Sequence, residues 1–377
     1  MSGTVNQQYI DWLSQVCNAR VSNTQLIQPL WSGYGACFRA TLDYSSDGVT
    51  NDSENNRAVC VKQIQQVQES STTLHKANHQ PVTKVVVKCA TPPSTLSHPK
   101  GWNGEASHNR KCQSFKVENF FYSDVQLQTD ASCRTAKYIS HSQQGESSLL
   151  VMEDLAHCGY TRTASSLTVT QCKTVLKWLA HFHARFLNVK KEFDSRNTTL
   201  WPEGTYWHLA TREDEFQAMP DSLLKQNAVA IAKMLASANY KTLVHGDAKV
   251  ANFCFTKDFS NCAAVDFQYV GYGVGIKDVA YFLGSALSTE THIAHRDALL
   301  NTYFLALEDA LLARLLKFDN LTNFKHSDIK HIIAEWKNLY PFACSDFYRF
   351  LAGWSPEHWK IDAELEYQTN IALAALK

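Results

Sequence analysis

An acid, an amide and a second acid are gathered in one short stretch of the chain. Asp247 and Asn252 stand in the run His-Gly-Asp-x4-Asn, and Asp266 opens the run Asp-Phe-Gln. Apolar residues at 253–255 and 263–265 flank the turn-like segment 257–261, which predicts a hairpin. That hairpin would bring the three side chains to one edge of a small sheet. Such a trio fits phosphoryl transfer, in which one carboxylate orients a hydroxyl while an amide oxygen and a carboxylate hold Mg²⁺ on nucleotide phosphates.

Each of the three residues also has a structural explanation when it is taken alone. Gly-Asp and Asn favour turns, and Asp266 can cap the end of a strand. The joint pattern is far less expected by chance than any one of its members. We therefore interpret Asp247, Asn252 and Asp266 as a functional set.

The run HGDxxxxN followed by a DFQ-type aspartate resembles the kinase-like small-molecule phosphotransferases, the group of aminoglycoside phosphotransferases and choline kinases. The Gln after Asp-Phe, and the later run Asp278-Val-Ala-Tyr-Phe-Leu, are most similar to the ecdysteroid-kinase-like branch. This resemblance implies that Asp247 is the catalytic base and that Asn252 and Asp266 are metal ligands. It also implies that Asp278 is a structural acid, which steadies the catalytic loop without touching substrate.

Two further assignments follow from the same resemblance, which spans residues 30–287. Lys249 stands where some of these phosphotransferases carry a basic or aromatic residue, so it is a candidate catalytic residue that contacts the γ-phosphate. The alternative is that its side chain is simply solvated. The run Leu-Leu-Val-Met-Glu-Asp-Leu at 149–155 resembles the last strand and connector of the N-terminal lobe. Met152 and Glu153 are therefore candidates for binding adenine through the backbone, although a plain core strand explains the run equally well.

A nucleotide clamp is expected in the N-terminal part of the chain. Gly33 and Gly35, in Ser-Gly-Tyr-Gly-Ala-Cys-Phe, lie between two candidate strands and can let the backbone approach phosphates. Two glycines at this spacing are also common in hairpins. The run is no dinucleotide fingerprint, because its third glycine is missing and a strand follows it rather than a helix.

Lys88 stands on the otherwise apolar run Val-Val-Val-Lys-Cys-Ala. A buried ammonium needs a partner, whereas a lysine on an edge strand can face water. The resemblance implies that Lys88 contacts nucleotide phosphates and pairs with a helical glutamate. We expect that partner to be Glu118, with Glu105 as the second choice.

The order of the elements predicts an α+β, bilobal, protein-kinase-like fold. Residues 1–152 form the nucleotide-clamping lobe, an antiparallel sheet of five or more strands with one main helix. Residues 153–377 form a mostly helical lobe for catalysis and acceptor binding. The expected strands are 24–30, 37–44, 58–67, 83–90, 133–140 and 147–155, and the expected helices are 1–20, 107–125, 169–187, 222–238 and several after 276.

Other residues invite a functional reading that their spacing does not support. His181 and His183 point to different sides of a helix and cannot share a metal ion, and His183 falls on the apolar stripe as a core histidine.

Eight aromatic residues near the C-terminus can form a wall for a bulky or cationic acceptor, although core packing is the simpler explanation. They are Trp336, Tyr340, Phe342, Phe347, Tyr348, Phe350, Trp354 and Trp359.

Composition excludes some classes of partner. The 36 basic and 36 acidic residues give no net charge, so nothing favours nucleic acid. No apolar run approaches the roughly 20 residues of a membrane-spanning helix. The 11 cysteines are scattered without a Cys-x-x-Cys pair, and no secretory signal is visible, so we expect free thiols and a cytoplasmic location.

Together these features predict an enzyme that uses ATP and Mg²⁺ to phosphorylate a hydroxyl of a small-molecule alcohol. The alternative is a pseudokinase that binds a nucleotide or a small molecule without turnover. A protein kinase is disfavoured, because the chain has His-Gly-Asp rather than His-Arg-Asp and leaves little room for an activation loop after Phe267. The acceptor, the choice between ATP and GTP and the oligomeric state stay open.

Overall fold

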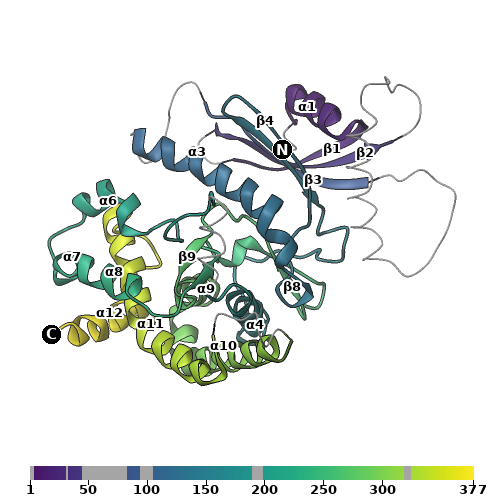
Figure 1. The fold of residues 1–377 in the computed structure, drawn as a ribbon. Coiled ribbons are helices and arrows are strands. Elements are labelled where there is room, and N and C mark those ends of the chain that lie inside the picture. The colour runs from purple at the N-terminus through teal and green to yellow at the C-terminus, as the bar shows by residue number, and fades with distance from the viewer. Residues whose placement is uncertain (1–3, 31–32, 45–82, 94–104, 189–197, 318–323) are drawn as a thin grey trace. The chain divides into compact units, whose positions relative to one another are not determined.

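The computed structural model describes residues 4–30, 33–44, 83–93, 105–188, 198–317 and 324–377. Contacts between residues divide the chain into two compact units (Figure 1). Unit 1 consists of Met1–Leu127 and Ala136–Thr161, and unit 2 consists of Gln128–Thr135 and Arg162–Lys377. The roles predicted for residues 1–152 and 153–377 stay predictions.

Unit 1 is built on a five-stranded antiparallel sheet whose strand order is β1-β2-β3-β5-β4. The strands are β1 (Arg20–Pro29), β2 (Gly35–Asp43), β3 (Thr83–Ala90), β4 (Tyr138–Gln144) and β5 (Ser147–Glu153). β3 lies at the centre, and its Val85, Val87 and Cys89 are fully buried in the core. A β-branched run of this kind suits a strand that is covered by neighbours.

Among the described residues of unit 1, two α-helices accompany the sheet (Figure 1). α1 (Gln7–Cys17) begins where Asn6 accepts a hydrogen bond from the amide of Gln8, and its Trp12, Leu13 and Cys17 join the core of the sheet. α3 (Glu105–Phe120) runs on into a π-helical turn at Phe121–Val125, so the helix expected at 107–125 is confirmed.

The expected strand at 133–140 is wrong over its first half. Ala131–Cys133 forms a 3₁₀ turn instead, because the Asp130 carboxylate accepts a hydrogen bond from the amide of Ser132 and caps it. β4 therefore starts only at Tyr138. The strand expected at 58–67 lies outside the described residues.

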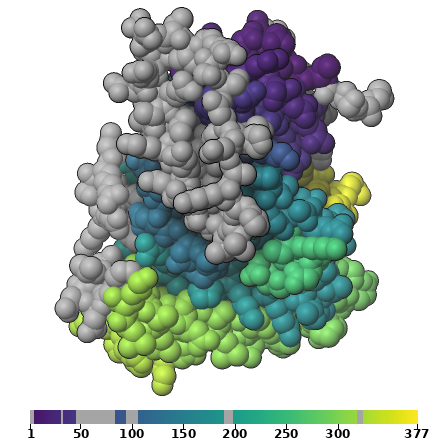
Figure 2. All heavy atoms as spheres, turned by 90° about the vertical axis from the view of Figure 1, so that its right-hand side faces the viewer, coloured from purple at the N-terminus to yellow at the C-terminus, as the bar shows by residue number. Residues whose placement is uncertain are grey.

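Unit 2 is mostly helical. The α-helices among its described residues are α4 (Val169–Arg185), α6 (Glu213–Ala218), α7 (Leu223–Gln226), α8 (Ala228–Ala236), α9 (Ile276–Ala286), α10 (Thr289–Lys317), α11 (His326–Trp354) and α12 (Ala363–Ala375). α10 packs along α4, and α10 and α11 form a layer along one side of the unit (Figures 1 and 2). Among the described helices, none is long and apolar enough to cross a bilayer.

Two small antiparallel sheets interrupt the helices of unit 2. β6 (Thr242–Val244) pairs with β9 (Gly271–Gly273), and β7 (Phe253–Phe255) pairs with β8 (Cys262–Ala264). The second pair confirms the hairpin that the sequence predicts. Together the sheets position the segments 245–252 and 265–270, where the candidate chemistry lies.

Candidate active site

The loop that carries Asp247 leaves β6 through a conformation that requires glycine. Gly246 has a φ of +80°, and a Cβ atom there would overlap the carbonyl oxygen of Tyr269. The amide of Tyr206 donates to the carbonyl of Gly246 at 3.2 Å. A side chain at position 246 would therefore be strained and would also push apart the segments that hold the loop.

Asp278, near the start of α9, holds the same loop through hydrogen bonds to its backbone. Its two carboxylate oxygens accept the amide of His245 at 2.6 Å and the amide of Gly246 at 3.0 Å. Asp278 also lies 3.1 Å from Nε2 of His183, whose Nδ1 lies 2.9 Å from the Tyr303 hydroxyl. All of these side chains are buried. The structure thus confirms Asp278 as an acid that holds the loop, and His183 as a hydrogen-bonded core histidine.

The carboxylate of Asp247 is held by one oxygen only. Its Oδ2 accepts from Nζ of Lys249 at 2.8 Å and from Nδ2 of Asn252 at 3.0 Å. Its Oδ1 is buried and receives no hydrogen bond of ordinary geometry from the described residues, although the Tyr281 hydroxyl lies close enough to interact with the carboxylate. A buried acceptor without a donor is costly, and in a site it marks where a donor on a ligand would bind.

Asn252 and Asp266 lie at the two ends of the β7–β8 hairpin. Asn252 ends a short 3₁₀ turn before β7, and its amide nitrogen also donates to the backbone oxygen of Asp247 at 2.8 Å. Asp266 follows β8 with a φ of +69°, a left-handed conformation that aspartate tolerates better than most residues. The carboxylate of Asp247 and then that of Asp266 raise the pKa of Lys249, so the two acids surround one ammonium.

The donor set suits a hard cation. The Asn252 amide nitrogen donates to Asp247, so the amide oxygen is the atom that Asn252 could offer to a cation. Among the described residues, no group of three or more His, Cys, Asp and Glu side chains can hold a metal by itself. A cation held by Asn252 and Asp266 would complete its shell with phosphate and water oxygens, as Mg²⁺ does.

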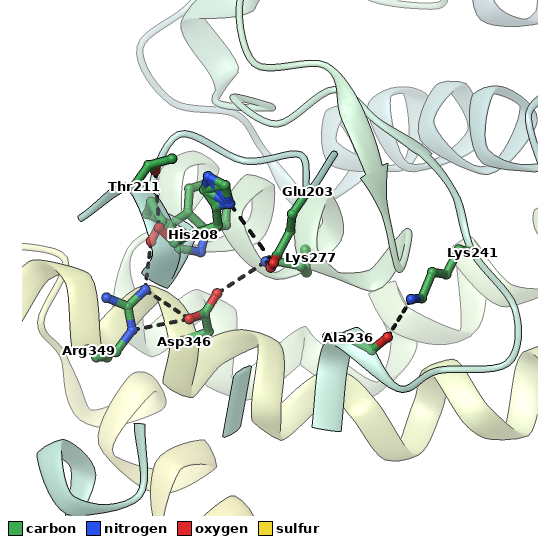
Figure 3. A network of polar contacts seen from close by, with 9 residues as sticks. Glu203, His208, Thr211, Ala236, Lys241, Lys277, Asp346 and Arg349 are labelled. Atoms are coloured by element: carbon green, nitrogen blue, oxygen red, sulfur yellow. Dashed lines mark hydrogen bonds and ion pairs between the residues drawn. The ribbon is translucent and has the colours of Figure 1, made fainter. Parts of the chain in front are cut away.

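A buried charge network anchors the segment that contacts this loop (Figure 3). Lys277 is 1% exposed, and its Nζ lies 3.2 Å from both Glu203 Oε1 and Asp346 Oδ2. Asp346 also pairs with Arg349 at 2.9 Å, and Arg349 donates to the carbonyl of Trp207 at 2.6 Å. The network ties residues 203–207 to α9 and α11, and thereby supports the hydrogen bond to Gly246.

In unit 1 the structure brings Lys88 and Glu118 together. Nζ of Lys88, on β3, lies 2.7 Å from Oε2 of Glu118, on α3, and both side chains are buried. Glu105 lies in the first turn of α3 and is exposed, so it is not this partner. The pair is the one that the sequence predicts, and its role toward a nucleotide stays a prediction.

Gly33 lies in the β1–β2 connection and Gly35 begins β2, with positive φ values of +78° and +123°. A Cβ atom on Gly35 would overlap the carbonyl of Cys89 on β3, whereas Gly33 has open space around its Cα. Close strand packing therefore explains Gly35 by itself, and Gly33 stays the better candidate for a phosphate-covering turn.

Met152 and Glu153 end β5 inside the sheet. Met152 is in register with Val86 on one side and Tyr138 on the other. The Glu153 amide donates to the carbonyl of Lys137 at 2.9 Å, and its carboxylate accepts the amide of Lys137 at 3.1 Å. Since the sheet already engages the amide of Glu153, its predicted contact with adenine has no geometric support beyond its position at the strand end.

Sequence reasoning missed the residues that approach Asp247 from outside its hairpin, from two turns and from α9. Tyr206 donates to the Tyr281 hydroxyl at 3.3 Å, and burial together with the charge of Asp247 raises the pKa of both tyrosines. Lys360 also lies in the electrostatic field of Asp247. The sequence signals near this group were the run Asp278-Val-Ala-Tyr-Phe-Leu, which contains Tyr281, and the aromatic C-terminal region that precedes Lys360. Most of its rings are core residues, namely Trp336, Tyr340, Phe342, Phe347 and Phe350.

Comparison with protein families identifies the family to which this chain belongs. The model of the ecdysteroid kinase-like family matches residues 98–203 and 189–317. The chain belongs to the ecdysteroid kinase-like family. The matched region contains Glu118, Asp247, Asn252, Asp266 and Asp278, and the predicted kinase-like superfamily and fold class are confirmed.

Solved structures similar to this family member are small-molecule kinases of low sequence identity. An amicoumacin kinase bound to AMP-PNP and Ca²⁺ is 10% identical, with 85% of this chain and 95% of that chain covered and a TM-score of 0.42. Aminoglycoside phosphotransferase APH(4)-Ia is 10% identical, with 89% of this chain and 99% of that chain covered and a TM-score of 0.42. An ethanolamine kinase from Plasmodium vivax is 10% identical, with 93% of this chain and 82% of that chain covered and a TM-score of 0.40. No curated protein matches the chain in sequence.

Proposed function

We propose that the protein transfers the γ-phosphate of Mg-ATP to a hydroxyl of a small-molecule alcohol. The observation that carries this proposal is the carboxylate of Asp247. Lys249 and Asn252 fix its Oδ2, while its Oδ1 is buried beside the Tyr281 hydroxyl and receives no hydrogen bond of ordinary geometry from the described residues. A hydroxyl group of an acceptor would donate a hydrogen bond to that oxygen.

Asp247 then serves as the base. It accepts the hydroxyl proton at Oδ1 as the acceptor oxygen bonds to the γ-phosphorus, and the bond from that phosphorus to the bridging oxygen breaks to release ADP. Lys249 and Asn252 keep the carboxylate oriented, and Asp278 keeps the loop in place. Positioning of this kind supplies much of the catalysis in phosphoryl transfer.

Asn252 and Asp266 would hold Mg²⁺, which supplies neutralisation of the phosphate oxygens when it is bound. In unit 1, Lys88 would contact the phosphates while Glu118 holds its ammonium in one position. Gly33 would cover the phosphates with backbone amides, and Met152 and Glu153 mark the end of the strand beside the expected adenine site.

A thermal-shift titration with ATP and GTP, each with and without Mg²⁺, tests the nucleotide part. Nucleotide at 100 times its Kd should stabilise the protein by about 2.7 kcal/mol. The shift should need Mg²⁺ and should disappear in D266A. D258N is the matched control, because Asp258 is an exposed acid on the turn of the same hairpin.

ADP release with a panel of alcohols tests turnover. A Mg²⁺-dependent shift together with ADP release that needs an alcohol would support the proposal. A shift without ADP release for any alcohol would favour the nucleotide-binding alternative. The absence of any nucleotide shift would contradict the proposal.

A further inference from the structure

The turn between α11 and α12 is held in place by a ladder of rings. Phe350 stacks on Trp354 at 5.6 Å, Trp354 contacts His358 at 5.9 Å, and His358 stacks on Trp359 at 5.8 Å. The amide of Lys360 donates to Nδ1 of His358 at 3.1 Å. The backbone of Lys360 is therefore fixed where the turn leads into α12.

The side chain of Lys360 lies among three aromatic rings. Its Nζ is 4.5 Å from the ring centre of Tyr281, 5.5 Å from that of Trp359 and 5.8 Å from that of Phe347. Tyr281 and Phe347 are each 4% exposed and form a buried floor, whereas Trp359 is 68% exposed. Rings in this arrangement bind cations, and here the chain's own ammonium takes that place.

This ammonium has no carboxylate partner among the described residues. It nevertheless shares the electrostatic field of the catalytic loop, because the charges of Asp247 and Lys249 both act on it. Asp247 is paired with Lys249 at 2.8 Å, so its charge is shared between Lys249 and Lys360. A half-buried cation of this kind attracts an anion and repels another cation.

We propose that Lys360, with the rings of Tyr281, Phe347 and Trp359, selects the acceptor by charge. The site takes alcohols that carry an anionic oxygen group, such as a carboxylate, sulfate or phosphate, and rejects alcohols with a cationic head. This inference rests on the proposed function, because it assigns the acceptor end of the same site. Lys360 is thus a residue that determines specificity, and it lies outside the region matched by the family model.

Calorimetric binding of three matched probes tests the inference without nucleotide. The probes are hydroxybutyrate, choline, and the neutral alcohol in which carbon replaces the choline nitrogen. The native protein should bind hydroxybutyrate about tenfold more tightly than choline, the ratio expected for one cation–π or charge contact. K360M should lose this preference and gain choline binding in the vacated ring site.

Two variants serve as controls. K360R keeps the charge and should keep the preference for hydroxybutyrate. K337M removes another lysine that lies over a ring, at 5.1 Å from Phe304 on the α10–α11 surface, and should behave as the native protein does.

Three results would overturn the inference. They are equal binding of choline and hydroxybutyrate by the native protein, an unchanged preference in K360M, and no binding of any probe by any variant, choline to K360M included. The Mg-ATP shift is measured on the same samples. Loss of that shift alone would refute the proposed function, while the charge preference would still report on Lys360.

Discussion

At the scale of single residues, Asp247 and Asp266 are expected to fail in different ways. D247N keeps the shape of the side chain but removes the base, so kcat should fall by at least about 10²-fold while Mg-ATP binding persists. D266N should lose both turnover and the Mg²⁺-dependent thermal shift. Steady-state kinetics and thermal shifts check this, and near-native turnover in both variants would contradict the assignment.

The preference for an anionic over a cationic acceptor should depend on pH, because the ammonium of Lys360 loses its proton as the pH rises. The pKa of Lys360 is lowered to about 8, mainly by burial, which Asp247 opposes and Lys249 reinforces. The ammonium is therefore present at pH 7 and mostly lost by pH 9.5, while the nearby Tyr281 stays neutral because its own pKa is raised. The preference for hydroxybutyrate over choline should decline across this range in the native protein and stay flat in K360M.

At the scale of elements, the conformation of the loop after β6 is expected to decide activity. G246A places a Cβ atom against the carbonyl of Tyr269 at a φ of +80°, so it should lower both stability and turnover. G284A is the matched control, because Gly284 lies inside α9 with open space around its Cα. That change should stabilise the protein by about 0.5–1 kcal/mol. Urea unfolding and kinetics on both variants check this, and equal effects would refute the role of the loop.

The β3–α3 ion pair allows stability to be separated from nucleotide binding. E118Q removes the carboxylate 2.7 Å from a buried ammonium, which should cost about 3–5 kcal/mol. The double variant K88M/E118L replaces both charges by apolar groups and should recover most of that stability. All of these variants should bind Mg-ATP weakly. Native affinity in K88M/E118L would show that the pair is only structural.

At the scale of the whole molecule, buried histidines should make the fold sensitive to acid. The pKa of His292 is lowered to about 4, mainly by burial, which Asp362 opposes and Arg296 reinforces. The pKa of His208 is lowered to about 3 by burial and then by the charge of Lys277. Both values lie below the usual 6.5, so the unfolded chain takes up protons that the fold excludes. Stability is therefore lost as the pH falls from 6.5 toward 4.

The size of this effect can be checked with one variant. His292 should contribute a loss of up to about 2 kcal/mol between pH 7 and pH 5. H292Q, which cannot titrate, should show a shallower decline in its urea-unfolding free energy over that range. An identical decline in the variant and the native protein would contradict the assignment of His292.

Much of the site could be predicted because its signals are local. Asp247, Asn252 and Asp266 lie within one hairpin and its approaches, and alternation of apolar runs with a turn is visible in the sequence. The strand predicted at 83–90 has the same bounds as β3, because a continuous apolar, β-branched run of this length suits a buried central strand. The 3₁₀ turn at Ala131–Cys133 escaped prediction, since a side-chain cap by Asp130 outweighed strand propensity there.

The sequence by itself determined the chemistry that the chain offers, since residue type and short spacing define an acid–amide–acid set. The tertiary structure alone decided which distant groups complete it. Glu118 rather than Glu105 meets Lys88, Asp278 accepts the amides of His245 and Gly246, and Lys360 reaches the ring of Tyr281. These contacts depend on how helices pack against strands and loops, and local periodicity carries no record of that packing.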